Sequence, residues 1–454
     1  MKLVSKDGLI YPLLFFVAVL TFFWPVPRTI AVRHISLALS VITLWIIVYN
    51  SKNIFRQIVL DSYSKTKPIL ISLALTTFWF YFVAIFVSPE TEWSLKELNG
   101  QWLISTTCFL LGFSFLFFEA TTAKRVFIIF FIALMVHIIY LDLSALKLFV
   151  DNNGQLPLRL NGLTEGCDKA NYITNWALAF ACVDMYFRAT KKTKIIPVDN
   201  FIIFCCFLLI LLSSYFETMR FGFLGLFVTL FGFLVLYLFL GQNNLGIKKL
   251  LLIAPVILLI LSIFGYNAIK ADERWDSLID TIPIALDTNT NQAWKGFNTG
   301  KYEIPKLPNG EFVNESNYDR IAWAKEGFIL ITENPFGIGY GRNAFGHGLK
   351  AKYGEGGGHS HSGIIDLGIG TGFIGMGLWV VFLASLMYYG FRSFKKDESY
   401  FGMILLFIVS GFFFRMIVDS VIRDHMLEQF MFLVGLLLAL SIKEINEKNS
   451  TSTV

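Results

Sequence analysis

Cysteine and charged side chains are both scarce in this sequence, and each shortage excludes a class of protein. The chain has five cysteines in 454 residues, and only Cys167 lies outside the long apolar runs. So few thiols form no disulfide framework, and no Cys-x-x-Cys or mixed His/Cys metal motif is present. Charged residues make up 16% of the chain and hydrophobic residues 55%. This balance is typical of a protein embedded in a membrane.

Other common features are also missing. The sequence contains no repeat of solenoid length and no low-complexity domain. Its first apolar run continues through Trp24 and Pro25 without a cleavage site of the Ala-x-Ala type. We therefore expect no cleaved signal peptide.

Long apolar runs recur from one end of the chain to the other. The segments 250–269 and 403–414, for example, are nearly free of charge. A helix needs roughly 20 apolar residues to cross the hydrocarbon core, and it satisfies its own backbone groups there. We therefore predict an all-α polytopic membrane protein with about twelve transmembrane helices. The predicted spans lie near 8–26, 31–50, 68–88, 102–120, 125–148, 170–188, 200–218, 221–241, 250–269, 363–391, 400–418 and 425–442.

Basic residues are distributed unevenly between the connections of these spans. With a cytoplasmic N-terminus, most short cytoplasmic connections are basic, whereas an opposite one carries Glu90 and Glu92. This is the positive-inside pattern. It predicts cytoplasmic termini and one large periplasmic loop. The predicted organisation is transmembrane helices 1–9 in residues 1–269, the periplasmic loop domain in 270–362, transmembrane helices 10–12 in 363–442 and a cytoplasmic tail in 443–454.

The large loop is the one soluble segment long enough to hold a site. Residues 270–287 are amphipathic and predict a surface helix. Residues 317–333 place Ile321, Ala324, Phe328 and Ile331 at helical spacing and predict a second helix with an apolar face. A series of glycines from Gly337 to Gly358 follows and predicts flexible backbone before two histidines.

Those histidines, His359 and His361, precede the tenth span. Near pH 7 an imidazole is the side chain best able to take a proton from a sugar hydroxyl. His361 is the candidate general base and His359 a possible assistant. A metal site is the alternative, but two histidines without a partnering cysteine or carboxylate cluster are a weak ligand pattern. We expect no metal and no cofactor.

Arginines gather on the same predicted side. Arg220 follows the seventh span, Arg159 lies in the preceding outer connection, and Arg320 begins the second loop helix. A guanidinium group matches phosphate oxygens through a planar fork of two donors. The alternative for Arg220 is an anchor in the lipid headgroups. For Arg415 and Asp419, four residues apart, we favour a structural helix pair, and Arg423 with Asp424 suggests a loop pair.

A base and several guanidinium groups on one face suit the transfer of a group from a lipid-linked diphosphate. That leaving group departs as a weakly basic anion, so it needs charge stabilisation more than a proton. A glycosidase would instead need two placed carboxylic acids, and the sequence offers no such pair.

Three short motifs give the chain a family resemblance. Ten residues separate His361 from Gly372, Arg220 and Leu224 form an Arg-x-x-x-Leu motif, and 335–339 reads Pro-x-Gly-x-Gly. In this order, and with one large loop between the ninth and tenth spans, they resemble the bacterial O-antigen ligases. Ser362 departs from the family, which commonly has Asn after the histidine.

The resemblance implies a GT-C-like, metal-independent, inverting glycosyltransferase of the inner membrane. It would transfer polysaccharide from undecaprenyl diphosphate to a sugar hydroxyl of lipid A–core oligosaccharide at the periplasmic face, in lipopolysaccharide biosynthesis. His361 would be the base, while Arg220, Arg320 and, more weakly, Arg159 would bind the diphosphate. We expect the rate to rise with pH through an apparent pKa near that of ordinary histidine.

Two alternatives remain open. One is an O-antigen polymerase of the same superfamily, whose acceptor is also a lipid-linked glycan. The other is a secondary transporter whose outer arginines recognise an anionic solute, although the sequence lacks a matched pair of broken helices in its two halves. Nucleic acid is not an expected partner.

Overall fold

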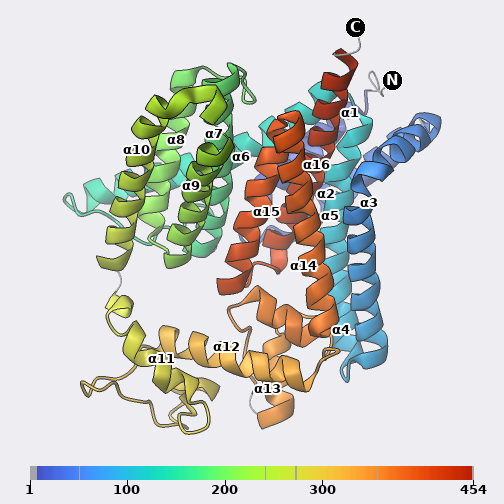
Figure 1. Cartoon of the computed structure of the whole chain (residues 1–454). Helices are drawn as coiled ribbons and strands as arrows, with labels where there is room; N and C mark the ends of the chain where they lie inside the picture. The colour runs from blue at the N-terminus through green and yellow to red at the C-terminus, as the bar shows by residue number, and fades with distance from the viewer. Residues whose placement is uncertain (1–7, 51, 241, 271–272, 355, 452–454) are drawn as a thin grey trace.

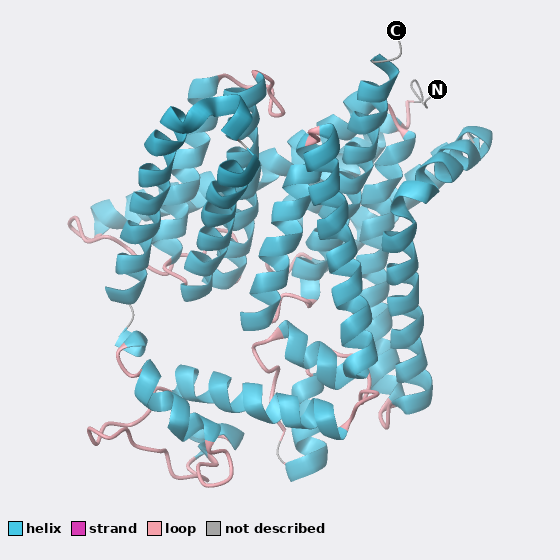
Figure 2. Cartoon of the chain, in the orientation of Figure 1, coloured by secondary structure: helices cyan, strands magenta, loops and turns pink. Residues whose placement is uncertain are grey.

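The computed structural model describes residues 8–50, 52–240, 242–270, 273–354 and 356–451 (Figure 1). Within these ranges some helical side chains lie outside the description, among them those of residues 52–61, 220, 221, 223, 237–240 and 242–253. The described residues form helices and contain no strand (Figure 2). The all-α prediction is therefore confirmed for them.

The α-helices run in chain order from α1 to α16, with short 3-10 or π segments between some of them. The bounds are α1 Ile10–Phe23, α2 Ile30–Asn50, α3 Lys52–Phe82, α4 Thr91–Glu97, α5 Leu103–Ser114, α6 Ala120–Asp151, α7 Cys167–Lys191, α8 Asn200–Glu217, α9 Arg220–Leu240, α10 Gln242–Lys270, α11 Leu278–Leu286, α12 Glu315–Glu333, α13 Ala344–Tyr353, α14 Gly363–Asp397, α15 Tyr400–Val418 and α16 Asp424–Thr451. The π segments are Val83–Val87 and Leu98–Trp102, and the 3-10 segments are Phe115–Phe117, Glu273–Trp275, Ala293–Lys295 and Phe297–Thr299.

Eight stretches of the described chain are long and apolar enough to cross a membrane. They are Ile30–Asn50, Ser62–Val87, Thr91–Phe117, Ala120–Asp151, Asn200–Glu217, Gly363–Asp397, Tyr400–Val418 and Asp424–Ser450. The other four predicted spans fall on α1, α7, α9 and α10, which lie alongside them (Figure 1). The chain is thus a polytopic helical membrane protein, while the count of twelve spans stays a prediction.

Helix α16 is at the centre of the bundle, and its apolar window is buried throughout. It packs most extensively on α5, where glycines on both helices permit close approach. A Cβ on Gly112 would lie 2.1 Å from the carbonyl oxygen of Phe432, and one on Gly435 would lie 2.3 Å from that of Phe109. Small residues of this kind let helices associate in lipid, where burial of apolar surface drives little.

Helices α11, α12 and α13 lie together at the end of the bundle opposite the two chain termini (Figure 1). They share a small hydrophobic core that includes Trp294, Tyr318, Leu330 and Phe345. The predicted loop is therefore a packed helical unit. Its periplasmic location remains a prediction.

Two details of the predicted loop are wrong. The first is the single surface helix over 270–287, because the described residues there are divided between the end of α10, a 3-10 turn and α11. The helix predicted over 317–333 is confirmed as α12, although its predicted apolar face is partly exposed, with Ala324 exposed and Phe328 61% exposed. The buried face runs instead through Tyr318, Ala322 and Leu330, which meet the loop core.

The second error concerns the glycine series, part of which is helical. Gly346 and Gly348 lie within α13. A Cβ on Gly346 would lie 1.9 Å from the carbonyl oxygen of Gly357. This glycine therefore allows a close approach of the chain before the histidines, a role that sequence composition alone does not distinguish from flexibility.

Candidate functional site around the histidine pair

The two histidines end the connection into α14, and the first half of α14 is shaped by glycine. Gly372 has φ +69°, a left-handed conformation that breaks the helix and that glycine adopts at little cost. The break frees backbone carbonyls one turn earlier. Ile338 and Gly339 donate their amide hydrogens to the carbonyls of Ile369 and Gly370, at 3.0 and 2.9 Å.

The Pro-x-Gly-x-Gly motif thus docks on the kink of α14. Phe373 N–H donates to the Pro335 carbonyl at 3.0 Å, and the Trp79 indole donates to the Thr371 carbonyl at 2.8 Å. A Cβ on Gly337 would lie 2.5 Å from the oxygen of Gly370. The two sequence motifs therefore meet in space, and their glycines fix the direction in which the start of α14 presents the histidines.

His359 and His361 lie against each other, with ring centroids 4.2 Å apart. The backbone N–H of His361 donates to Nδ1 of His359 at 3.2 Å, so this nitrogen is unprotonated and the His359 ring, where neutral, carries its proton on Nε2. His361 has φ +59°, a conformation that is uncommon for a non-glycine residue and that collects at functional sites. Its ring stacks on Trp323 of α12, with centroids 5.7 Å apart and planes 5° apart.

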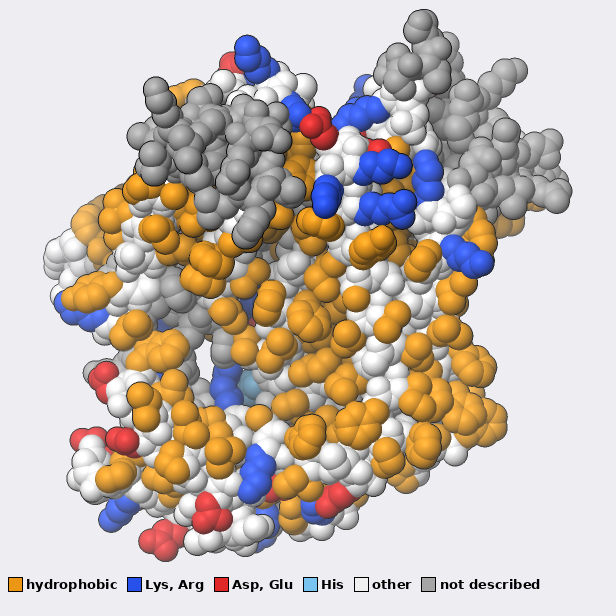
Figure 3. Space-filling view, in the orientation of Figure 1, with side chains coloured by type: hydrophobic (Ala, Val, Ile, Leu, Met, Phe, Trp, Pro, Cys, Tyr) orange, Lys and Arg blue, Asp and Glu red, His pale blue; other side chains and the backbone are white. Residues whose placement is uncertain are grey.

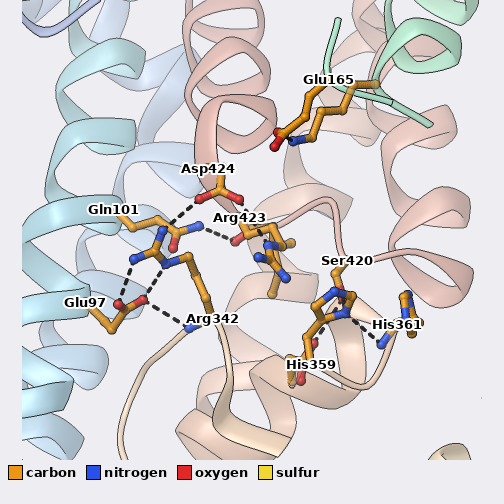
Figure 4. A network of polar contacts seen from close by, with 12 residues as sticks. Glu97, Gln101, Glu165, Arg342, His359, His361, Ser420, Arg423 and Asp424 are labelled. Carbon is orange, nitrogen blue, oxygen red and sulfur yellow. Dashed lines mark hydrogen bonds and ion pairs between the residues drawn. The ribbon is translucent and has the colours of Figure 1, made fainter. Parts of the chain in front are cut away.

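Ser420 lies beside His359 (Figure 4) and next to the buried carboxylate of Asp366. Its Oγ is 3.2 Å from His359 Nδ1 and 3.1 Å from Asp366 Oδ2, so these two acceptors share its single hydrogen. The other oxygen of Asp366 accepts from Ser360 N–H at 3.1 Å. Asp366 is only 4% exposed. This carboxylate therefore ties the loop that bears the histidines to the segment that joins α15 and α16.

Sequence reasoning missed Asp366 and Ser420. The signal that could have found Asp366 is an ionisable residue within an apolar span, which is costly to hold there and is a functional candidate by default. No comparable signal marks Ser420, because its distance in sequence from Asp366 is 54 residues.

Two guanidinium groups act on the histidine pair. Burial, together with the positive charges of Arg320 and Arg423, lowers the pKa of His361 to about 4, against the opposing effect of Asp419. Burial and Arg423 similarly lower the pKa of His359 to about 4. Both imidazoles are therefore neutral at pH 7. The expectation of a pKa near the ordinary value is wrong, since desolvation and two nearby cations disfavour the imidazolium.

Arg423 is more than the predicted loop pair. Its Nε does donate to Asp424 Oδ2 at 3.1 Å, which confirms that pair (Figure 4). Its Nη1 is buried and has no hydrogen-bond partner among the described residues. A guanidinium nitrogen without a partner beside two neutral imidazoles is suited to receive an anionic oxygen.

Arg342 fixes the segment that carries Arg423 to the rest of the bundle (Figure 4). It donates to both carboxylate oxygens of Glu97, at 2.7 and 2.9 Å, and to Asp424 Oδ1 at 2.8 Å. Gln101 Nε2 donates to the carbonyl of Ile422 at 2.9 Å. These contacts hold the segment in place without involving the histidines.

The predicted pair of Arg415 and Asp419 is confirmed, at 3.1 Å. Arg415 also donates to the side-chain oxygen of Asn171 at 3.1 Å, and Asn171 Nδ2 donates to Glu217 Oε2 at 2.8 Å. Asp419 in turn accepts the backbone N–H of Gly363 at 3.1 Å. This chain of contacts joins the end of α8 to the start of α14.

The other predicted arginines are placed less completely. Arg320 lies on α12 and is close enough to affect both histidines. Arg220 begins α9, but its side chain lies outside the described residues. Arg159 is exposed, in the connection before α7, and its neighbour Leu160 donates its backbone N–H to the Phe216 carbonyl at 3.1 Å. The described contacts thus bring Arg320 to the histidine pair and Arg159 to the end of α8.

The cluster is open at one side. His359 and His361 are both only half-buried, so solvent and a substrate have access to the pair. Among the described residues, no group of three or more His, Cys, Asp or Glu side chains is placed to hold a metal ion. The arrangement can take a proton through a neutral imidazole and can stabilise negative charge through guanidinium groups.

Comparison with known proteins relates the segment that holds this site to one family. Residues 201–380 match the family model described as O-antigen ligase. The matched segment runs from α8 into α14 and includes Arg220, Arg320, His359 and His361. No curated protein matches the chain. The segment that holds the histidine site therefore matches the O-antigen ligase family model, which confirms the resemblance to the O-antigen ligase superfamily.

Proposed function

We propose that the protein is an O-antigen ligase, an inverting glycosyltransferase that moves polysaccharide from undecaprenyl diphosphate to a sugar hydroxyl of lipid A–core oligosaccharide. The observation that carries the proposal is the neutral histidine pair at the start of α14, under the field of Arg320 and Arg423. A neutral base beside fixed positive charge matches a reaction in which a hydroxyl loses a proton while an anionic diphosphate departs.

In the proposed reaction His361 takes the proton of the acceptor hydroxyl. The hydroxyl oxygen forms a bond to the anomeric carbon, and the bond from that carbon to the diphosphate oxygen breaks on the opposite face. The electron pair leaves with undecaprenyl diphosphate, which Arg320, Arg423 and Arg220 stabilise. Because the leaving group needs no proton, one base is sufficient and no metal is required.

Donor binding prepares the base in this scheme. The diphosphate neutralises the charges of Arg320 and Arg423, which lower the pKa of the histidines in the free protein. An anion next to an imidazole favours the imidazolium and raises its pKa. His361 therefore becomes a stronger base only when the donor is in place, which limits wasteful chemistry without it.

His359 positions His361 and does not itself react. Its Nδ1 is occupied by the N–H of His361 and lies beside Ser420, so one nitrogen holds the backbone of the base. Within the described part of the chain no residue forms a hydrogen bond with the His361 ring, whose face stacks on Trp323. The free ring is the better placed of the two to meet a substrate.

The reaction is tested with purified protein, a lipid-diphosphate glycan and lipid A–core acceptor. We expect glycan transfer to the core lipid, insensitive to a chelator. In cells that lack the protein we expect uncapped core lipid on a glycolipid gel. Core lipid capped by a single repeat would instead indicate the polymerase, and unchanged glycolipids with lost solute uptake would indicate the transporter.

The proposed location of the site on the periplasmic face of the inner membrane has its own test. A cysteine at Ser316, near the start of α12, should react with an impermeant thiol reagent in intact spheroplasts. Labelling only after lysis would reverse the topology and remove the site from the periplasm.

A further inference from the structure

A second polar site lies at the end of α14 remote from the histidines. A cavity of about 690 Å³ opens there between α3, α14 and α16. Pockets of about 300–1,000 Å³ are of the size that holds small ligands. None of its lining residues belongs to the histidine site, so any ligand here is separate from the donor and the acceptor.

The lining divides into a basic rim and an apolar wall. Arg392 and Lys396 line the cavity near the end of α14, and Lys65 lines it from the middle of α3. Pro68, Val381 and Ala384 line it farther into the bundle. On α14 the two parts are about 12 Å apart at the usual rise of a helix. Such a cavity matches a molecule with an anionic head and an apolar tail.

The rim cations are available to an anion. Lys65 donates to Asn446 Oδ1, a neutral partner, at 2.8 Å. Arg392 and Lys396 form no ion pair with any described residue, whereas the nearby Lys191 and Lys448 pair with Glu398 and Glu444. Figure 3 shows Lys and Arg side chains gathered at this end of the molecule. One carboxylate, that of Asp397, also lines the cavity, which leaves three cations against one anion.

The surroundings are those of a membrane surface. Helix α14 has 35 residues, about 50 Å at 1.5 Å per residue, and so extends beyond a hydrocarbon core of about 30 Å. Tyr388 and Tyr389, which also line the cavity, are of the type enriched at headgroup depth. Basic pockets between transmembrane helices at this depth bind phospholipid head groups.

We propose that this cavity binds an anionic glycerophospholipid. Arg392, Lys396 and Lys65 hold the head-group phosphate, and an acyl chain lies along the apolar wall formed by α3 and α14. The bound lipid bridges helices that are distant in sequence and stabilises their packing at this end of the bundle. The proposal does not depend on the reaction at the histidines.

Purified protein is tested with phosphatidylglycerol and phosphatidylethanolamine by native mass spectrometry and thermal unfolding. We expect retained phosphatidylglycerol and a higher Tm with it than with the zwitterionic lipid. A contribution of about 1 kcal/mol per basic residue corresponds to about fivefold in affinity. The double variant R392Q/K396Q should therefore lose roughly 25-fold in phosphatidylglycerol affinity.

Two matched variants guard against a general effect of charge or folding. K395Q removes a cation from the same helix that does not line the cavity, and its affinity should be unchanged. R392K keeps the charge and should retain most of the affinity. Equal loss in K395Q, or undiminished affinity in the double variant, would overturn the proposal. So would the same Tm increase with inorganic phosphate alone, because that marks an ion site without a lipid.

Discussion

Cationic side chains at the two ends of α14 differ in burial and in ion pairing. At the histidine end, Arg415 is 6% exposed and pairs with Asp419, and the half-buried Arg423 pairs with Asp424. At the remote end, Arg392 and Lys396 are exposed and form no ion pair with the described residues. A buried cation must be paired or be intended for an anionic ligand, whereas an exposed one is solvated and costs little.

The difference shows how one helix serves two requirements. The histidine end is kinked at Gly372 and crossed by hydrogen bonds from three other segments, which preorganises a site for chemistry. The remote half of α14 is regular, and its cavity lies open at the rim. Removal of groups at the histidine end should therefore change the rate of transfer, whereas removal at the remote end should change the lipid affinity and the lipid-dependent Tm.

The largest expected effect at the histidine end is the loss of glycan transfer in His361→Ala. A general base typically contributes about 10²–10⁴-fold in rate, so transfer should nearly cease while donor binding persists. His359→Ala should be milder, because that ring only positions the base. Transfer by purified variants and donor binding by fluorescence titration separate the two effects. If His361→Ala were active and His359→Ala inactive, His359 would be the general base. If both variants were active, neither histidine would be the general base.

The next largest effect concerns the fork geometry of arginine. Arg320→Lys and Arg220→Lys keep the charge but lose the two-donor fork. With charge-assisted hydrogen bonds contributing about 1.5–3 kcal/mol, we expect transfer to fall by roughly 10- to 150-fold. Arg125→Lys, at an exposed position near the start of α6, is the control and should be unchanged. Near-normal transfer by Arg220→Lys would reduce that residue to a lipid-facing anchor.

A smaller loss of activity is expected from substitution of Asp366 or Ser420, which lie next to the loop that carries His359. Asp366→Asn and Ser420→Ala should each lower kcat by about tenfold, since each loosens the loop that carries the base without removing it. Because the two groups share one hydrogen bond, the double variant should be little worse than either single one. Multiplying effects in the double variant would show that Asp366 and Ser420 act independently.

The smallest expected effect is on pH dependence. The lowered pKa of His361, about 4, leaves the imidazole neutral above that value, so kcat/KM should be constant near neutrality and fall only in acid. The acid-side fall in kcat should occur at a higher pH than that in kcat/KM, because the anionic donor raises the pKa of His361 in the complex. Arg423→Gln removes a cation and should shift the kcat/KM limb upward by about one unit or less. A shift of this kcat/KM limb to lower pH would contradict the role of Arg423 as a cation that lowers the pKa of His361.

Much of the architecture was predictable because its causes are local in sequence. The twelve apolar runs all coincide with helices, since length and hydropathy decide that property within one segment. The structural pair of Arg415 and Asp419 was predictable for the same reason, as residues four apart meet on a helix. Residue type and spacing made His361 and Arg320 candidate site residues, and the structure places both in one cluster, while their roles stay predictions.

The tertiary structure alone decided how the histidines behave. Their lowered pKa depends on burial and on Arg320 and Arg423, which arrive from α12 and from the segment before α16. The carboxylate of Asp366 reaches His359 only through Ser420, 54 residues away in sequence. The kink at Gly372 and the packing of residues 335–339 against it set the position of the start of α14 and so bring these groups together. Local sequence fixes which groups are available, whereas their electrostatic effect depends on distances that only packing between helices sets.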